Sequence, residues 1–378
     1  MAIRNGSKLT ATAMASSVIH MSGCDLTVPG PTDSPPLVFT TIPTLASVAW
    51  ARHHGRVSSV RTTLPVIDLS DEALGERLRS VAHAVGFFYL TGHGVPDGLT
   101  DRLLTAARAL FALPQADKDA VAMVNSPHFR GYTRLGGELT GGAVDWREQL
   151  DVGPEREPLT DPAEAYLRLQ GPNQWPAGLP ELPAVVAEWD AALAAVARKL
   201  LQHWAISLGS PADVFDATFA DAPATLIKIV RYPARADSPQ GVGAHRDAGV
   251  LTLLLAEPGT TGLEVRGPHG EWIDVHPVPG AFIVNIGELL ELASDGYLRA
   301  TEHRVRIGDT ERISVPYFFN PRLDARLPVL TLPDELASGA RGVTADPSNE
   351  RIFAVYGRNA WKSRLRAHPD VAAAHQYV

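Results

Sequence analysis

Apolar and polar residues in the first part of the chain's folded region switch between the spacing of strands and that of helices. The stretch Leu64–Ser70 is rich in β-branched residues, which is typical of a strand. The segment after it has apolar residues at helical spacing and stops at Gly86. Residues 86–96 predict a second strand and a turn, and the next segment predicts an amphipathic helix that ends at Pro114. We therefore expect short strands and helices to alternate here.

The pattern changes twice further along the chain. Residues 182–209 carry the longest helical pattern, whereas residues 224–320 follow a period of two. The strand candidates are short and separated by Gly and Pro turns: ATLIKIVRYP, GVLTLLLAE, GLEVRG, EWIDVHPVPG, AFIVNIG, HRVRIG and RISVPYFFN. Closely spaced short strands favour a sandwich or jelly roll over a parallel sheet with crossover helices. We therefore predict a mainly β fold with flanking helices.

Composition divides the chain into three parts. Residues 1–62 are rich in Ser, Thr, Ala and Pro and have little periodicity, which favours a disordered extension or sequence translated from an early start. An export signal with Cys24 as a lipidation site is the alternative, although Thr, Ser and His interrupt the apolar stretch before it. We predict an N-terminal domain at 63–180. Residues 181–378 are expected to contain the long helix, the jelly roll and a C-terminal helix over the barrel.

Bulk composition narrows the functional classes. The 378-residue chain is 45% hydrophobic, enough for a sizeable core, and its net charge of −8 with scattered basic residues argues against nucleic acid or an anionic membrane as partner. No stretch reaches the roughly 18 consecutive apolar residues of a transmembrane helix. A single cysteine precludes an internal disulfide and favours a cytoplasmic location. The oligomeric state stays open.

A histidine and a carboxylate open one of the predicted strands. His245 and Asp247 are two residues apart, so in a strand both would point to the same side. His303, at the start of another strand candidate, can supply a third ligand. Two histidines and one carboxylate leave coordination positions open, and that arrangement suits the oxygen chemistry of Fe(II).

Arg312 and Ser314 lie on one face of the last strand candidate. An arginine that faces the inside of an apolar barrel needs an anionic partner. Its guanidinium can bind a carboxylate through two hydrogen bonds, and the serine hydroxyl can add a third. A short dicarboxylate could therefore bridge the metal and this pair. Zinc could occupy a site with two histidines and one carboxylate, but a zinc hydrolase has no use for the arginine–serine pair.

Residues 64–322 resemble the non-haem Fe(II)- and 2-oxoglutarate-dependent dioxygenases of the isopenicillin N synthase-like family. That family's His-x-Asp pair, later His and Arg-x-Ser pair are matched by His245, Asp247, His303, Arg312 and Ser314. The resemblance implies a double-stranded β-helix (jelly roll) core and an enzyme that uses Fe(II), 2-oxoglutarate and O₂. It implies that the first three residues bind the metal, and that Arg312 and Ser314 bind 2-oxoglutarate.

The resemblance also implies further contacts. Tyr232, just before the first ligand strand, matches a tyrosine that contacts the oxoacid in the family. The irregular stretch 125–153 should lie over the metal, so Arg130, Glu138 and Thr140 are candidate substrate residues. The implied partner is a small-molecule metabolite, since this stretch is short for docking a protein.

The reaction implied is oxidation of that metabolite, by hydroxylation, desaturation or cyclisation, with release of succinate and CO₂. Two related enzymes remain alternatives: an oxidase that uses no oxoacid, as isopenicillin N synthase does, and an ethylene-forming type that breaks down the oxoacid itself. A non-catalytic metabolite-binding protein on the same scaffold is the alternative from another class, although a binder has no reason to keep an open iron face.

Overall fold

The computed structural model describes residues 64–71, 73–235, 240–343 and 352–377. The expectation for residues 1–62 therefore lies outside the described residues. The described residues all fall within one compact unit, Val60–Val378. The division of the folded part at residue 180 stays a prediction.

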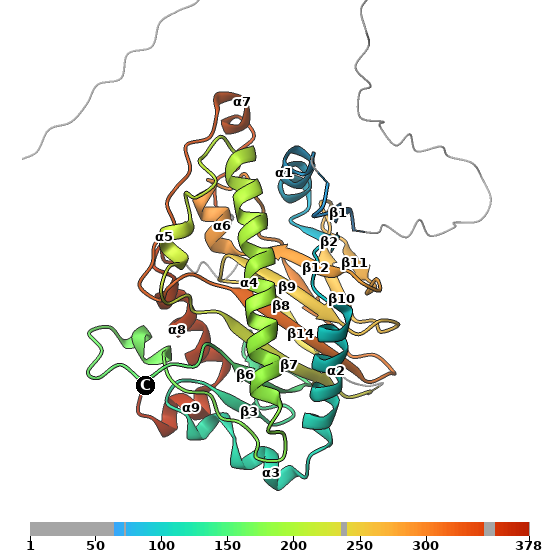
Figure 1. The fold of residues 1–378 in the computed structure, drawn as a ribbon, viewed down its shortest axis with the longest axis vertical. Helices are drawn as coiled ribbons and strands as arrows, with labels where there is room; N and C mark the ends of the chain where they lie inside the picture. Colours follow the sequence, from blue (N-terminus) through green and yellow to red (C-terminus); the bar gives the residue numbers. More distant parts are fainter. Residues whose placement is uncertain (1–63, 72, 236–239, 344–351, 378) are drawn as a thin grey trace, which may run out of the picture. The chain divides into compact units, whose positions relative to one another are not determined.

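Among the described residues, eight strands form the major sheet, in the order β1-β2-β12-β9-β14-β7-β6-β3 (Figure 1). Strands β1 and β2 are parallel, and every other neighbouring pair is antiparallel. The strands span Val66–Asp68 (β1), Phe87–Thr91 (β2), Phe282–Ile286 (β12), Leu251–Ala256 (β9), Arg312–Phe319 (β14), Leu226–Tyr232 (β7), Glu148–Val152 (β6) and Gly131–Thr133 (β3). This sheet takes strands from both sides of residue 180.

A minor sheet of four strands, in the order β11-β10-β13-β8, packs on the inner face of the major sheet. Its strands span Trp272–Val275 (β11), Leu263–Arg266 (β10), His303–Val305 (β13) and Val242–His245 (β8). Apolar side chains of both sheets meet in one buried cluster, among them Val230 and Ile283 from the major sheet and Val265 and Val305 from the minor one. A separate hairpin pairs β4 (Leu139–Thr140) with β5 (Ala143–Val144).

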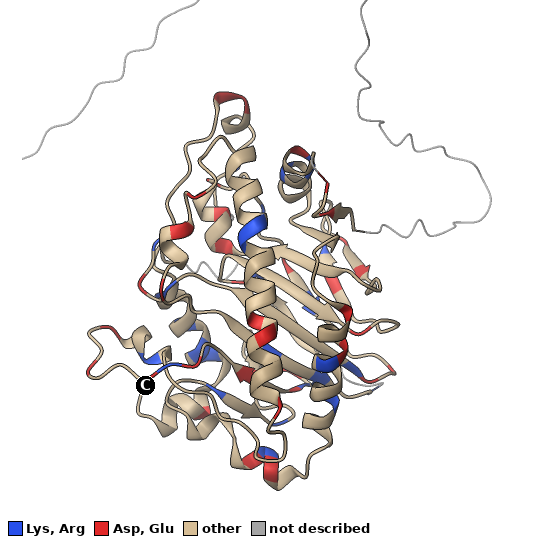
Figure 2. Cartoon of the chain, in the orientation of Figure 1, with Lys and Arg blue, Asp and Glu red and all other residues tan. Residues whose placement is uncertain are grey.

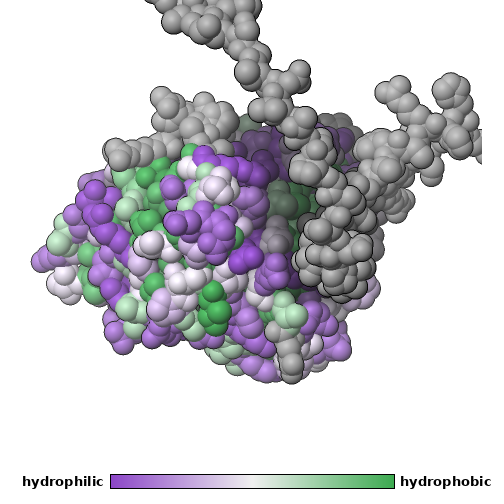
Figure 3. All heavy atoms as spheres, turned by 90° about the horizontal axis from the view of Figure 1, so that it is seen from above, coloured by the Kyte–Doolittle hydropathy of each residue, from purple (hydrophilic) through white to green (hydrophobic). Residues whose placement is uncertain are grey.

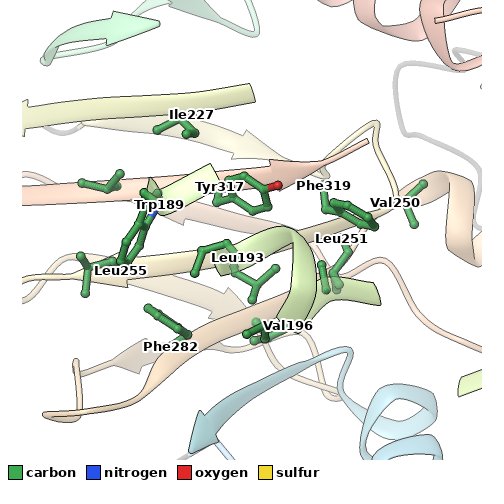
Figure 4. Packing of buried hydrophobic residues seen from close by; sticks show 14 of the residues in the cluster. Trp189, Leu193, Val196, Ile227, Val250, Leu251, Leu255, Phe282, Tyr317 and Phe319 are labelled. Carbon is green, nitrogen blue, oxygen red and sulfur yellow. The ribbon is translucent and has the colours of Figure 1, made fainter. Parts of the chain in front are cut away.

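The outer face of the major sheet packs against the long helix α4 (Leu182–Ser207). Its buried residues recur every three or four positions, so they form one apolar stripe. Trp189, Leu193 and Val196 lie in one cluster with Leu255, Phe282, Tyr317 and Phe319 of the sheet (Figure 4). The α1 helix (Leu74–Ala84) and the α2 helix (Asp97–Ala112) pack against α4. The predicted long helix is thus present.

Shorter helices complete the described part. They are α3 (Gln115–Ala120), α5 (Asp216–Phe219), α6 (Glu288–Ala293), α7 (Asp334–Ala337), α8 (Tyr356–Ala367), α9 (Pro369–Ala374), and the 3₁₀ turns η1 (Met123–Asn125) and η2 (Ala165–Leu169). The expected single C-terminal helix forms as two, α8 and α9, because Pro369 cannot donate the hydrogen bond that would continue α8.

The surface of the described part mixes residue types. Acidic and basic residues are interspersed over its elements (Figure 2), and polar and apolar residues are intermingled on the face seen from above (Figure 3). Exposed large apolar side chains such as Val144, Ile206 and Val329 come from separate elements, as is normal for scattered surface residues. Among the described helices, none is both long and apolar enough to cross a membrane.

Candidate metal centre and active site

The three predicted metal ligands converge. His245 ends β8 and His303 begins β13, and the antiparallel pairing places these two residues directly opposite each other. The Oδ1 atom of Asp247 lies 3.6 Å from Nε2 of His245 and 3.7 Å from Nε2 of His303. Ligand atoms about 2.1 Å from one shared ion lie roughly 3–4 Å apart, so these three atoms could bind a single cation. In the described part they are the one such group of His, Cys, Asp or Glu.

Asp247 reaches this position in a different way from the one expected. It lies beyond the end of β8, in the bend before β9, so strand alternation does not orient it. Instead, its Oδ2 atom accepts hydrogen bonds from the Thr252 hydroxyl at 2.6 Å and from the Asn285 amide at 2.7 Å. These two donors leave Oδ1 directed at the histidines.

Each imidazole is oriented by a backbone carbonyl. Nδ1 of His245 lies 2.8 Å from the carbonyl oxygen of Gly243, and Nδ1 of His303 lies 3.1 Å from that of Thr301. A carbonyl only accepts, so Nδ1 of each ring carries a proton and Nε2 is the atom that faces Asp247. That is the tautomer needed for metal binding through Nε2.

The electrostatics of the group favour a bound cation. Burial alone would raise the pKa of Asp247, but His303 and His245 hold it well below its ordinary value. Burial and the neighbouring His245 lower the pKa of His303 to about 4. For His245, burial is outweighed by the carboxylate of Asp247, so its pKa is raised. Asp247 is therefore ionised and His303 neutral at neutral pH, as ligands must be.

Arg312, Ser314 and Tyr232 lie together on the inner face of the major sheet. Arg312 pairs in register with Tyr232, and its guanidinium lies 4.6 Å from the centre of the tyrosine ring. One of its nitrogens, Nη1, donates to the carbonyl of Thr261 at 3.0 Å, whereas the buried Nε has no hydrogen-bond partner among the described residues. Burial lowers the pKa of Arg312. A buried guanidinium that forms no ion pair with a described carboxylate can receive an anionic ligand.

Next to the predicted metal ligands, the inner face of the major sheet is not fully covered, and we call this partly exposed patch the hollow. Leu254, Pro316 and Phe318 lie in the middle of the major sheet yet are only half-buried. Phe318 pairs in register with Thr252, the residue that holds Asp247. The half-exposed side chains therefore border a space next to the metal ligands. A separate cavity of about 520 Å³ lies on the outer face of the sheet, beside α4, and includes Ile227.

The three candidate substrate residues lie in different surroundings. Glu138 is buried and accepts a hydrogen bond from Nζ of Lys228 at 2.7 Å. Thr140 lies on β4, which packs beside β8, and its hydroxyl donates to Asp145 at 2.7 Å. The guanidinium of Arg130 packs against Gly153 and donates to the carbonyl of Leu169, so it faces η2. Their roles toward a substrate stay predictions.

The sequence analysis missed polar residues on the inner face of β6. Residues 125–153 were expected to be irregular, yet β6 forms at Glu148–Val152 and joins the major sheet. Arg147, Gln149 and Asp151 are buried. Their polar side chains recur at every second position, and this alternation is the signal that could have revealed a strand with a polar inner face.

Comparisons with known proteins identify the family of the chain. Two family models match: the non-haem dioxygenase in morphine synthesis N-terminal model at residues 64–178, and the 2OG-Fe(II) oxygenase superfamily model at residues 224–321. A 2-oxoglutarate-dependent dioxygenase, frbJ, of Dothideomycetidae sp. (strain 11243) is 32% identical, covering 82% of this chain and 90% of the relative. A homoarginine-6-hydroxylase of Oryza sativa subsp. japonica is 33% identical, over 69% and 79%. The chain belongs to the 2-oxoglutarate- and Fe(II)-dependent oxygenases.

Solved structures support the fold. A full-length Neurospora crassa protein, crystallised in complex with alpha-KG, has a TM-score of 0.66 at 23% identity, covering 81% of this chain and 98% of that one. The rice dioxygenase for auxin oxidation has a TM-score of 0.58 at 28% identity, covering 80% and 95%. The predicted jelly-roll core and the prediction of an oxidoreductase are confirmed. The oxidase, ethylene-forming and non-catalytic alternatives are not favoured.

Proposed function

We propose that His245, Asp247 and His303 bind the iron of this oxygenase. The donor set fits Fe(II): two imidazole nitrogens and one ionised carboxylate oxygen, close enough to share one ion, with the remaining coordination positions left open. When bound, Fe(II) supplies the activation of O₂ that couples oxidation of a substrate to conversion of 2-oxoglutarate into succinate and CO₂.

Arg312, Ser314 and Tyr232 anchor 2-oxoglutarate in this proposal. The observation that carries it is the buried Arg312, which has a free Nε and no described acidic partner and lies on the same inner face as the hollow beside the metal ligands. A carboxylate placed there accepts charge-assisted hydrogen bonds from the guanidinium and from the Ser314 hydroxyl. The chain's own share of the reaction is to orient the dicarboxylate and to exclude water.

In the overall reaction, a substrate C–H bond, 2-oxoglutarate and O₂ are converted into a substrate C–OH group, succinate and CO₂. Hydroxylation is the default outcome, and desaturation or cyclisation requires only a different placement of the substrate in the same hollow. The substrate is a small molecule. The similar proteins do not agree on its class, because one is a homoarginine-6-hydroxylase and another is a dioxygenase for auxin oxidation. A cytoplasmic location, supported by the single cysteine, is part of the proposal.

The test measures succinate formed from 2-oxoglutarate by the iron-loaded chain. We expect Arg312→Gln to raise the KM for 2-oxoglutarate by about 100-fold, because a buried charge-assisted pair is lost, and to leave iron affinity unchanged. Arg198→Gln is the matched control, since Arg198 also contacts an aromatic ring and a backbone carbonyl, but from α4 on the outer side of the sheet. An unchanged KM in Arg312→Gln would contradict the proposed anchor.

A further inference from the structure

A buried ladder of alternating charges crosses the inner face next to the metal ligands. Neighbours along it are 2.5–3.6 Å apart, and each is at most 8% exposed. In order, its members are Asp145, Arg147, Glu138, Lys228, Asp151 and Arg364. Three carboxylates alternate with three cations, so the ladder is electrically neutral.

One end of this ladder lies close to the metal ligands. Asp145 accepts a hydrogen bond from the backbone N–H of Gly243 on β8, two residues before the first histidine ligand. The charge of Arg147 acts on both His245 and Tyr232. This end of the ladder therefore lies beside the region in which a substrate must lie to be oxidised.

Several polar atoms in the ladder and beside it have no hydrogen-bond partner among the described residues. They include a donor, Nε of Arg147, and an acceptor, Oε1 of Gln149, together with Nε2 of His368. Gln149 is fully buried and pairs in register with Val230, whose side chain lies in the cluster between the two sheets. Buried polar atoms without a partner are costly, so a ligand that offers both an acceptor and a donor would stabilise this region.

Charge balance narrows the class of ligand. In the proposed complex, Fe(II) and Arg312 together offset Asp247 and the dianionic 2-oxoglutarate, and the six members of the ladder balance one another. The buried Arg130 acts on Asp151 and Arg364, at the end of the ladder away from Asp145. A substrate with one unbalanced charge would leave that charge buried without compensation. A substrate with one positive and one negative group adds no net charge and can still form charge-assisted hydrogen bonds with Arg147 and Glu138.

We propose that Arg147, Gln149 and Glu138 form the recognition site for a small zwitterionic substrate of the amino-acid class. The substrate carboxylate accepts a hydrogen bond from Nε of Arg147, and its ammonium or guanidinium group donates to Oε1 of Gln149 and to Glu138. Its apolar segment packs against Phe318 and Leu254, which places its C–H bonds beside the metal ligands. This inference rests on the proposed function and names the substrate class for that site.

The test is isothermal titration of the full chain with Fe(II) and 2-oxoglutarate under anaerobic conditions. The probes are the proteinogenic L-amino acids and L-homoarginine, with agmatine as the cation that lacks a carboxylate, indole-3-acetate as the anion and thymine as the neutral molecule. We expect at least one amino acid to bind and the three other probes to bind at least tenfold more weakly. No binding by any amino acid, or tighter binding of indole-3-acetate or thymine, would overturn the inference.

Substitutions of Arg147 and Glu138 test whether these residues bind the amino acid. Arg147→Gln is expected to weaken binding of the amino acid by about 30-fold, the usual effect of losing a charge-assisted hydrogen bond, while 2-oxoglutarate still binds. Glu138→Gln should also weaken binding of the amino acid. Glu148→Gln is the matched control, because Glu148 is also a buried, ion-paired glutamate, bound to Lys118 on the outer face of β6. Unchanged binding in Arg147→Gln overturns the assignment.

These measurements distinguish a failure of the proposed substrate class from a failure of the proposed function. If 2-oxoglutarate does not bind in an iron-dependent manner to the unmodified chain, the proposed function fails. If 2-oxoglutarate binds but the amino acids do not, only the substrate class fails. Because Arg147 contacts two carboxylates, the variant Arg147→Lys is included, which keeps the positive charge. Retained binding of 2-oxoglutarate in each variant shows that the site is folded.

Discussion

At the scale of single residues, Asp247 depends on two donors that carry no obvious signal in the sequence. Thr252 and Asn285 both hydrogen-bond to its Oδ2 atom, one from β9 and the other from β12. They fix the carboxylate so that Oδ1 faces the two histidines. Residues that orient a metal ligand in this way contribute to metal affinity without touching the ion.

Replacing Thr252 by valine should therefore weaken iron binding by roughly 10- to 100-fold. Valine has nearly the same shape, so the fold is retained while the carboxylate loses one of its two donors. Competition for Fe(II) against a coloured chelator measures the change. Thr260→Val, in a loop where the hydroxyl contacts only the Glu257 carbonyl, is the control. Equal iron affinity in the two variants would mean that Asp247 is held by other contacts.

His368 makes stability depend on pH. Burial lowers its pKa from 6.5 to about 4, so the unfolded chain binds this proton more readily than the folded protein does. Above pH 6.5 the imidazole is neutral in both states and does not lower the free energy of unfolding. As pH falls toward 4, the unfolded chain takes up the proton first, so the free energy of unfolding decreases. The loss is on the order of 3 kcal/mol. Urea unfolding of the metal-free chain at pH 7.5 and pH 4.5 should show a smaller pH effect in His368→Gln, and an identical effect would contradict the assignment.

The residues that sequence patterns revealed differ in kind from those they missed. His245, Asp247, His303 and Arg312 were predicted because their spacing matches short, specific motifs that metal and carboxylate binding require. Arg147 was missed because its position depends on the pairing of β6 with β7 and on Glu138, which binds both Arg147 and Lys228 of β7. Such contacts leave no local pattern.

At the scale of elements, helix α6 positions the loop that carries Asp247. The backbone N–H of Glu288 donates to the carbonyl of Asp247 at 2.8 Å, and that of Leu289 donates to the carbonyl of Gly249 at 3.0 Å. The start of a helix has free N–H groups, and here they bind the carbonyls of the ligand loop. The link between α6 and the predicted metal ligand was not expected from the sequence.

Gly287 allows this close approach. A Cβ atom at this position would lie 2.2 Å from the carbonyl oxygen of Gly249 and 3.1 Å from that of Asp247, both of them backbone atoms that cannot turn aside. Gly287→Ala should destabilise the fold by about 3 kcal/mol and weaken iron binding, because the ligand loop must shift. Thermal unfolding and iron titration measure both effects. Gly98→Ala, with open space around the position, is the control and should neither destabilise the fold nor weaken iron binding. If Gly287→Ala also leaves both quantities unchanged, α6 does not position the loop.

Element boundaries show what periodicity cannot predict. Runs of apolar residues with a period of two predicted most strands of both sheets but not β3, β6 and β8, in which polar residues or glycine interrupt that pattern. The pattern also did not predict that Asp247 would lie past the end of β8, since a ligand in a bend is oriented by its hydrogen bonds and not by the pleat. The break between α8 and α9 could have been predicted from Pro369.

At the scale of the whole described unit, the site depends on strands that are far apart in sequence. The major sheet joins β6, before residue 180, to β7 and β14, after it. The inner face of those three strands brings the charge ladder beside Arg312 and Ser314, while the minor sheet supplies the two histidines. The proposed iron ligands, the proposed dicarboxylate anchor and the charge ladder therefore come together only when both sheets have formed.

The most direct test of this account is the visible absorption spectrum of the full chain under anaerobic conditions after addition of Fe(II) and 2-oxoglutarate. The account predicts a charge-transfer band that saturates at one iron per chain, requires 2-oxoglutarate, and is absent in His303→Ala. Iron binding without such a band, or a band of unchanged strength in His303→Ala, would contradict it.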